Sequence, residues 1–375
     1  ANTGDILITT DRIVQNADIT ATGNVVLNAA ADIELNEGVL TANDRLIHLI
    51  AGAGVQQNFG TLPIHGGLVA TELLLEGTGD FNLIAEGVNQ IDTVAGDVNG
   101  IVALINSQAL TIGSVTDLLA NTTDGLTAET LLVLAETGDL TVSQAATATT
   151  GNLGLFTDDG GILIDAAVVG AALIDIEQIG AVGDINFTVN GSAAADGDIS
   201  LITENNIVMA DGATATAVGN GRVEAGGDIT LGGISADNLR IEAAGAIIDG
   251  GDTDTDASAT NLQLVAGNDI GSNANAIEID AGTLALSSTT GSAYLSADNG
   301  VIIGDVATFD VPYIDAPDGS TVLDPVAGLT GATTAVGLFI EANGAIQVDE
   351  AVTATAGDLL LDAQGGDLAI NATVD

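Results

Sequence analysis

A run of carboxylates at residues 249–258, DGGDTDTDAS, is the part of the sequence best suited to chemistry. Asp252, Asp254 and Asp256 alternate after a glycine turn, and Asp249 stands just before it. Carboxylates at every second position can converge on a calcium ion when the loop curls, because calcium prefers roughly six to eight oxygen ligands. The run therefore predicts a calcium site, with an acidic, solvated turn as the simpler interpretation.

This run does not match an EF-hand loop. Ala257 stands where that loop has glycine, and Gln263 stands where it has a bidentate glutamate. Calcium is thus the one cofactor that the sequence suggests, and the fold is expected to require none.

Other chemistry-bearing residues are few. The only histidines, His48 and His65, are too few to define a metal or acid–base site without cysteine, and we expect them on the surface or in loops. The chain has no lysine and four arginines, of which Arg222 and Arg240 are expected to neutralise neighbouring glutamates. A sugar-cleaving enzyme needs either two carboxylates held at a set separation or a basic cleft. We therefore expect no catalytic residues and no enzymatic activity.

Composition excludes several partners. Fifty-two acidic residues against four arginines give a formal net charge of −48, which repels nucleic-acid backbones and anionic lipids. The longest uncharged apolar stretch near the middle of the chain, 166–174, is far shorter than the roughly 20 residues that a membrane span needs. We expect neither nucleic-acid binding nor membrane insertion.

An internal repeat carries most of the structural information. Glycine, then Asp or Asn, then an apolar-x-apolar triplet occurs ten times, where composition alone would give about one match. Ile185, Phe187 and Val189 alternate with polar residues after one such glycine, which is the pattern of a short strand with one buried face. The glycines are expected at the corners between strands.

The spacing of these glycines predicts the fold. The steps from Gly4 to Gly23 and from Gly227 to Gly245 are each close to the length expected for coils of about 20 residues. Stacked coils make an all-β parallel β-helix, a β-solenoid, and the handedness of parallel crossovers favours a right-handed one. We expect a single continuous solenoid over residues 1–375.

The repeat is least regular at 43–66, 86–130 and 305–332. The last of these holds three of the four prolines, and it is expected to be a protruding loop because proline is poorly tolerated inside a ladder. Helical signals at 44–54 and 127–136 are weaker than strand signals, so both segments are expected to be strands.

At 238–251, 261–303 and 357–370 the repeats resemble those of filamentous-haemagglutinin-type and autotransporter-type passengers of large bacterial surface proteins. The resemblance implies an exported segment at the bacterial cell surface. It leaves the ligand open.

These observations favour a non-enzymatic extracellular structural protein, a rigid element of a surface filament or giant adhesin. Both ends of the sequence follow the repeat pattern without a polar cap, which predicts end-to-end association with itself or a longer natural chain. The alternative is a carbohydrate-binding or polysaccharide-degrading β-helix that meets a glycan or cell-surface receptor through 305–332.

Overall fold

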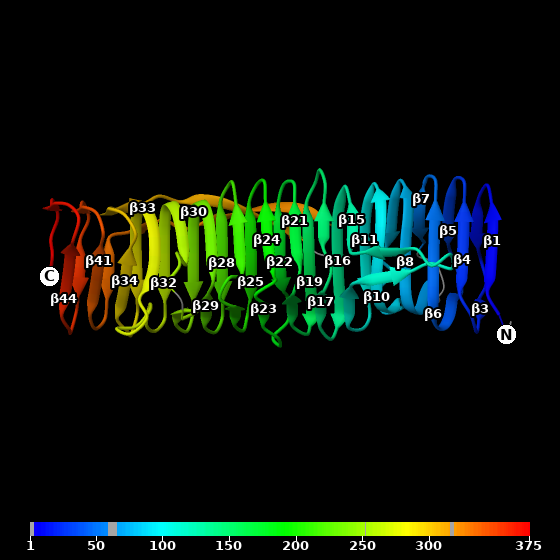
Figure 1. Cartoon of the computed structure of the whole chain (residues 1–375), viewed down its shortest axis with the longest axis horizontal. Coiled ribbons are helices and arrows are strands. Elements are labelled where there is room, and N and C mark those ends of the chain that lie inside the picture. The colour runs from blue at the N-terminus through cyan, green and yellow to red at the C-terminus, as the bar shows by residue number, and fades with distance from the viewer. Residues whose placement is uncertain (1–3, 59–65, 252, 316–318) are drawn as a thin grey trace. The chain divides into compact units, whose positions relative to one another are not determined.

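The structure, a computed structural model, describes residues 4–58, 66–251, 253–315 and 319–375. These residues form β-strands and no α-helix, so none contributes a helix with the length and hydropathy of a membrane span. The predicted all-β parallel solenoid is confirmed, with about 16 turns (Figure 1).

Contacts divide the chain into two compact units. The first comprises Ala1–Ala172, Gln178–Gly183 and Asp315–Gly319, and the second comprises Leu173–Glu177, Asp184–Ile314 and Ser320–Asp375. A single continuous solenoid stays a prediction.

The strands of the first unit are β1 (Ile6–Thr10), β2 (Ile13–Gln15), β3 (Ile19–Ala21), β4 (Val25–Ala29), β5 (Asp32–Leu35), β6 (Val39–Ala51), β7 (Gly54–Gln57), β8 (Gly67–Thr78), β9 (Asp80–Leu83), β10 (Gln90–Asn99), β11 (Ile101–Asn106), β12 (Leu110–Ile112), β13 (Ser114–Thr116), β14 (Thr122–Asp124), β15 (Leu126–Ala128), β16 (Thr130–Thr137), β17 (Leu140–Val142), β18 (Ala146–Ala148), β19 (Leu153–Asp159), β20 (Ile162–Ile164) and β21 (Ala167–Gly170). Both segments with weak helical signals, 44–54 and 127–136, lie mainly in strands, as predicted.

The strands that belong wholly or mainly to the second unit are β22 (Ile174–Gln178), β23 (Ile185–Phe187), β24 (Ser192–Ala195), β25 (Ile199–Thr203), β26 (Ile207–Met209), β27 (Thr214–Ala217), β28 (Gly221–Ala225), β29 (Ile229–Leu231), β30 (Gly233–Ala243), β31 (Ile247–Asp249), β32 (Ala257–Ala266), β33 (Ile277–Ser288), β34 (Ala293–Ala297), β35 (Val301–Ile303), β36 (Asp305–Val306), β37 (Phe309–Asp315), β38 (Ser320–Val326), β39 (Leu329–Thr330), β40 (Ala332–Thr334), β41 (Leu338–Ala342), β42 (Ile346–Val348), β43 (Val352–Ala354), β44 (Leu359–Ala363) and β45 (Leu368–Ile370).

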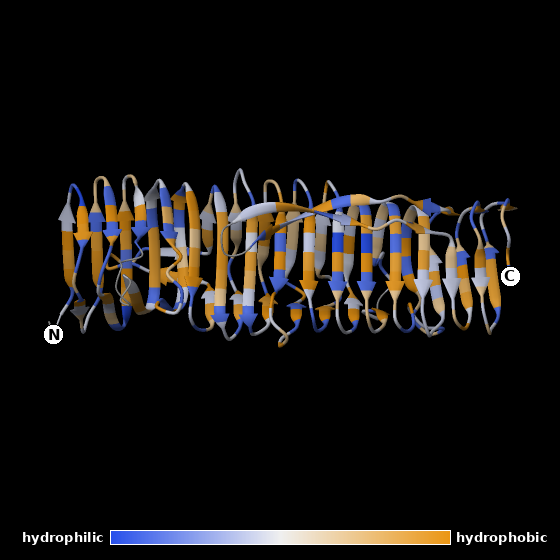
Figure 2. Ribbon diagram, turned by 180° about the vertical axis from the view of Figure 1, so that it is seen from behind, coloured by the Kyte–Doolittle hydropathy of each residue, from blue (hydrophilic) through white to orange (hydrophobic). Residues whose placement is uncertain are grey.

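Alternation along each short strand places one set of side chains inside the coil. Successive turns pair in parallel, so like residues stack in columns, as Figure 2 shows by alternating hydropathy. One column of the second unit consists of five buried isoleucines: Ile185, Ile207, Ile229, Ile247 and Ile270. The interior is therefore aliphatic, as the composition predicts.

The turns are close to the predicted length. Leu131 pairs with Leu153 in the first unit, and Ile185 pairs with Ile207 in the second, so both of these turns are slightly longer than the predicted coil. A turn slightly shorter than the predicted coil joins Gly221 to Leu239. The register therefore tolerates small changes in coil length at the corners.

The Gly-Asp pairs of the repeat form the corners. Asp5 Oδ1 accepts a hydrogen bond from the Asn24 amide one turn later at 2.8 Å, and Asp228 Oδ1 accepts one from the Ala246 amide at 2.7 Å. The glycine of the later turn passes so close that a Cβ at Gly245 would lie 2.0 Å from Asp228 Oδ1. The carboxylate thus satisfies a corner amide that the ladder leaves unpaired, and the close approach requires glycine.

One short hairpin leaves the first unit's turns. Strands β13 and β14 pair antiparallel, within the stretch 86–130 where the repeat is irregular. Val115 on β13 packs against Leu46, Leu74 and Ala95 on the outer faces of β6, β8 and β10. The hairpin therefore covers part of the coil's exterior.

A longer excursion, here called the strap, comprises the described residues of 305–330. Leu286 pairs with Ala332, about two coil lengths farther along the chain, so the strap is inserted into a turn whose ladder continues beyond it. Strands β36 and β39 pair antiparallel, and β37 and β38 form a separate two-stranded sheet. Pro312 and Pro325 lie in that sheet, outside the parallel ladder, where proline is tolerated.

The strap leaves the stack of turns in the proline-containing stretch, as the sequence predicts, and then lies along the second unit (Figure 2). The Asn220 side chain donates a hydrogen bond to the Asp310 carbonyl at 2.8 Å, and the Gln263 side chain donates one to the Val306 carbonyl at 3.3 Å. Val311 and Ile314, on β37 of the strap, are themselves buried. The strap is thus a packed layer over the outer strand faces.

Candidate functional site

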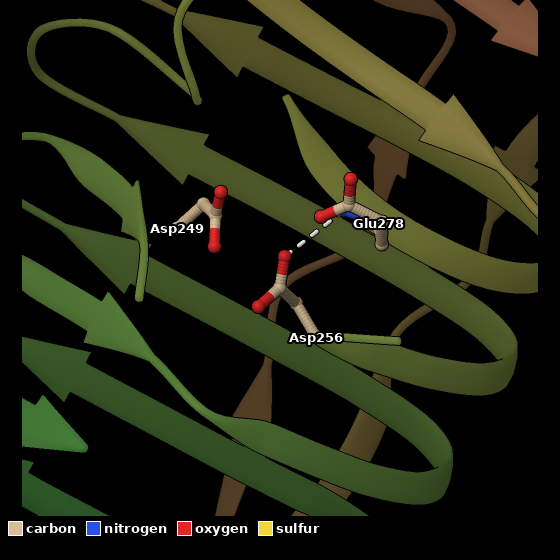
Figure 3. A group of neighbouring side chains, drawn as sticks. All are labelled: Asp249, Asp256 and Glu278. Carbon is tan, nitrogen blue, oxygen red and sulfur yellow. Dashed lines mark hydrogen bonds between the residues drawn. The ribbon is translucent and has the colours of Figure 1, made fainter. Parts of the chain in front are cut away.

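Three carboxylates from two successive turns meet at one corner of the second unit. Asp249 ends β31, Asp256 immediately precedes β32, and Glu278 lies near the start of β33 (Figure 3). One carboxylate oxygen from each residue lies within 4.8 Å of those of the other two. We call these three residues the acidic triad.

Backbone contacts hold the triad in place. Asp249 Oδ1 accepts a hydrogen bond from the Gly251 amide at 2.7 Å, and Asp256 Oδ2 accepts one from the Glu278 amide at 2.9 Å. Asp249 is 5% exposed and Asp256 is 1% exposed. Asp256 Oδ1 is buried and has no hydrogen-bond partner. A buried carboxylate oxygen without a partner is costly, so this corner suits a further ligand.

The electrostatics of the triad agree with this geometry. Burial is the largest cause of a raised pKa at Asp256, which reaches about 8, and the Asp249 and Glu278 carboxylates add to the rise. The hydrogen bond from the Glu278 amide lowers this pKa and so opposes the rise. Three carboxylates at this separation repel one another unless a proton or a cation lies among them.

A small pocket adjoins the triad. Its volume is about 200 Å³, and Asp249 lines it together with Asp269, Ser272 and Asn275. The pocket therefore offers water and small ions a route to Asp249, along a lining that also includes Ile247 and Ile248.

The structure rearranges the predicted calcium site. It brings Asp249 and Asp256 together, leaves Asp254 exposed and outside the triad, and adds Glu278. Asp252 lies outside the described residues. The sequence analysis missed Glu278 because this residue stands one full coil after Asp256. The coil length was the signal that could have identified it.

One histidine prediction was wrong. His48 is buried on β6, and its Nε2 lies 2.9 Å from Glu76 Oε2. Leu46, which precedes it on the same face, is covered by the β13–β14 hairpin, so this stretch of the outer face is not a solvated surface. His65 lies outside the described residues.

The predicted arginine roles are confirmed and extended. Arg222 contacts Glu224 on its own strand, and Arg240 contacts Glu242. Arg222 also contacts Asp324 on the strap, and Arg240 donates to the Ala327 carbonyl at 3.4 Å. Both arginines therefore help to hold the strap.

A second buried acid lies beneath the strap. Asp175 on β22 is fully buried, and its Oδ2 accepts a hydrogen bond from the Ile314 amide at 2.7 Å. Burial raises the pKa of Asp175 to about 7, with Glu177 adding to the rise and the Ile314 amide and Arg222 opposing it. Its Oδ1 has no hydrogen-bond partner. The folded state therefore favours the protonated form of this carboxyl group.

No protein-family model, curated protein or solved structure matches the chain. The resemblance to haemagglutinin-type and autotransporter-type passengers thus stays a prediction.

Proposed function

We propose that this protein is a non-enzymatic structural protein of the bacterial cell surface, a stiff element of a filament or giant adhesin. The observation that carries the proposal is the column of stacked isoleucines in the second unit, from Ile185 to Ile270. Each turn forms backbone hydrogen bonds with the next, and successive turns enclose the same aliphatic interior. Bending such a stack breaks ladder bonds and opens the core, so it resists bending.

The charge supports an exposed location. A net charge of −48 opposes lateral aggregation of long sheets, which is the usual hazard of exposed β-structure. We propose that the partner is the protein itself, either end to end or within a longer chain.

Negative-stain electron microscopy of the purified chain over a range of concentrations tests this proposal. Straight particles of constant width are expected, and their lengthening with concentration would support end-to-end association. Flexible or globular particles would refute the structural role. Straight particles of one length at every concentration would refute association while leaving the stiff element intact.

The alternative is a glycan-binding or glycan-cleaving role through the strap. A glycan array combined with a reducing-sugar assay separates the two proposals. Binding that disappears when 305–330 is replaced by a short turn would favour the alternative, and a null result in both assays would exclude it for the glycans tested.

A further inference from the structure

We infer that the acidic triad of Asp249, Asp256 and Glu278 binds one calcium ion. The inference does not rest on the proposed structural role, because it concerns three side chains and their immediate surroundings. One carboxylate oxygen from each residue lies within 4.8 Å of the corresponding oxygens of the other two. Calcium ligands lie about 2.4 Å from the ion, so oxygens on opposite sides of one ion are about 4.8 Å apart. The three carboxylates can therefore share an ion without a change of fold.

An independent observation comes from Asp256 itself. This side chain is 1% exposed and its Oδ1 makes no hydrogen bond. Figure 3 shows that the Asp256 oxygen that accepts the Glu278 amide points toward Glu278, whereas the other oxygen points away from it. The ion pairs of the described residues include neither Asp249 nor Asp256. A buried carboxylate without a cationic side chain is destabilising, and a bound cation removes that penalty.

The chemistry of the oxygens favours calcium over other ions. All three donors are hard carboxylates, which suit calcium, magnesium and manganese, whereas the triad lacks the histidine or cysteine ligands of most zinc and copper sites. Magnesium requires a near-ideal octahedron at about 2.0–2.1 Å and releases its water reluctantly, whereas calcium accepts irregular sites and more ligands. The pocket beside Asp249 leaves room for water to complete the coordination.

Isothermal titration of the whole chain with calcium chloride in about 150 mM potassium chloride tests the inference, because salt at that level screens diffuse attraction to a strongly acidic surface. Wild-type protein is expected to show one saturable site with a Kd of about 1 mM or tighter, and weaker binding of magnesium. Asp256→Asn and Glu278→Gln are each expected to weaken binding at least about tenfold.

The matched control is Asp254→Asn, which removes one charge from the same acidic run outside the triad. It is expected to leave the Kd within about twofold, because a lost surface charge acts only through screened, longer-range attraction. If Asp254→Asn weakens binding as much as Asp256→Asn, the site belongs to the acidic run and not to the triad. If wild-type and Asp256→Asn isotherms coincide, the inference is overturned and the triad holds a proton only.

A second measurement needs no variant and so does not depend on variant folding. Terbium replaces calcium, and its luminescence lifetime in light and heavy water counts the water molecules that remain on the bound ion. Several waters fewer than on the free ion are expected when three carboxylates coordinate it. A fully hydrated terbium ion would overturn the inference, because diffuse surface attraction leaves the water shell intact.

Discussion

Replacement of Asp175 by asparagine is expected to remove a pH-dependent weakness of the second unit. Asparagine has the shape of the protonated acid and can still accept the Ile314 amide hydrogen bond. Because burial raises the pKa of Asp175 from 3.8 to about 7, the folded state binds more protons than the unfolded state between those values. Stability contributed by this group is therefore full below about pH 4, falls as the pH rises, and is lost above about pH 7.

The magnitude follows from the same pKa difference. The rise from 3.8 to about 7 corresponds to roughly 4 kcal/mol, of which about 2.5 kcal/mol falls between pH 5 and pH 8. We expect the difference in unfolding free energy between Asp175→Asn and wild type to move in favour of the variant by about that amount over this range.

Urea unfolding of both proteins at pH 5 and pH 8 measures this difference, and hydrogen exchange of the Ile314 amide reports the strap directly. Asp324→Asn is the control, because Asp324 contacts Arg222 at the partly exposed edge of the strap. It is expected to cost no more than about 1 kcal/mol, with little change between the two pH values. A stability difference for Asp175→Asn that is the same at pH 5 and pH 8, or that favours wild type at pH 8, would refute the reasoning.

Three further predictions concern the core, the corners and the arginines. Leu264→Ala, at a fully buried position of β32, is expected to lower the free energy of unfolding by about 2–5 kcal/mol, as measured by urea unfolding; a loss below about 1 kcal/mol would contradict a packed interior. Gly77→Ala is expected to be more destabilising than Gly87→Ala in thermal melts, because both glycines have positive φ but only at Gly77 would a Cβ lie 1.9 Å from the Ala51 carbonyl oxygen; equal melting temperatures would remove the steric explanation. Arg222→Gln should speed hydrogen exchange across β37 and β38, and unchanged exchange in the strap would show that Arg222 does not hold it. Arg12→Gln, which loses exposed pairs with Asp32 and Glu34, should leave the thermal melt nearly unchanged.

Much of the solenoid could be predicted from local pattern. The pair Gly227-Asp228 directly precedes β29, and Gly183-Asp184 directly precedes β23, as the repeat indicates. The role of the aspartate was not evident, because its amide partner lies a whole turn later and becomes visible only when the register is known. Alternation identifies a buried face, but it does not say which amides the corners leave unpaired.

Prediction of the candidate site from local sequence pattern has the same limit. Asp249 and Asp256 were found because they stand close together in the sequence, whereas Glu278 depends on the length of one coil. His48 was placed wrongly because Val115, which covers the neighbouring Leu46, belongs to a hairpin several strands farther along the chain. Periodicity describes one coil at a time, so contacts made by segments that leave the coil cannot be read from it.

The ladder that resumes at Ala332 shows that a turn of this fold tolerates a large insertion at its corner. Leu286 pairs with Ala332, which follows the whole strap in the sequence. The next turn, from Ala332 to Val352, has the ordinary coil length. Strand pairing between two turns therefore does not depend on the length of the segment that connects them. Such a scaffold can exchange its appendages, in evolution or by grafting, while the underlying stack keeps its form.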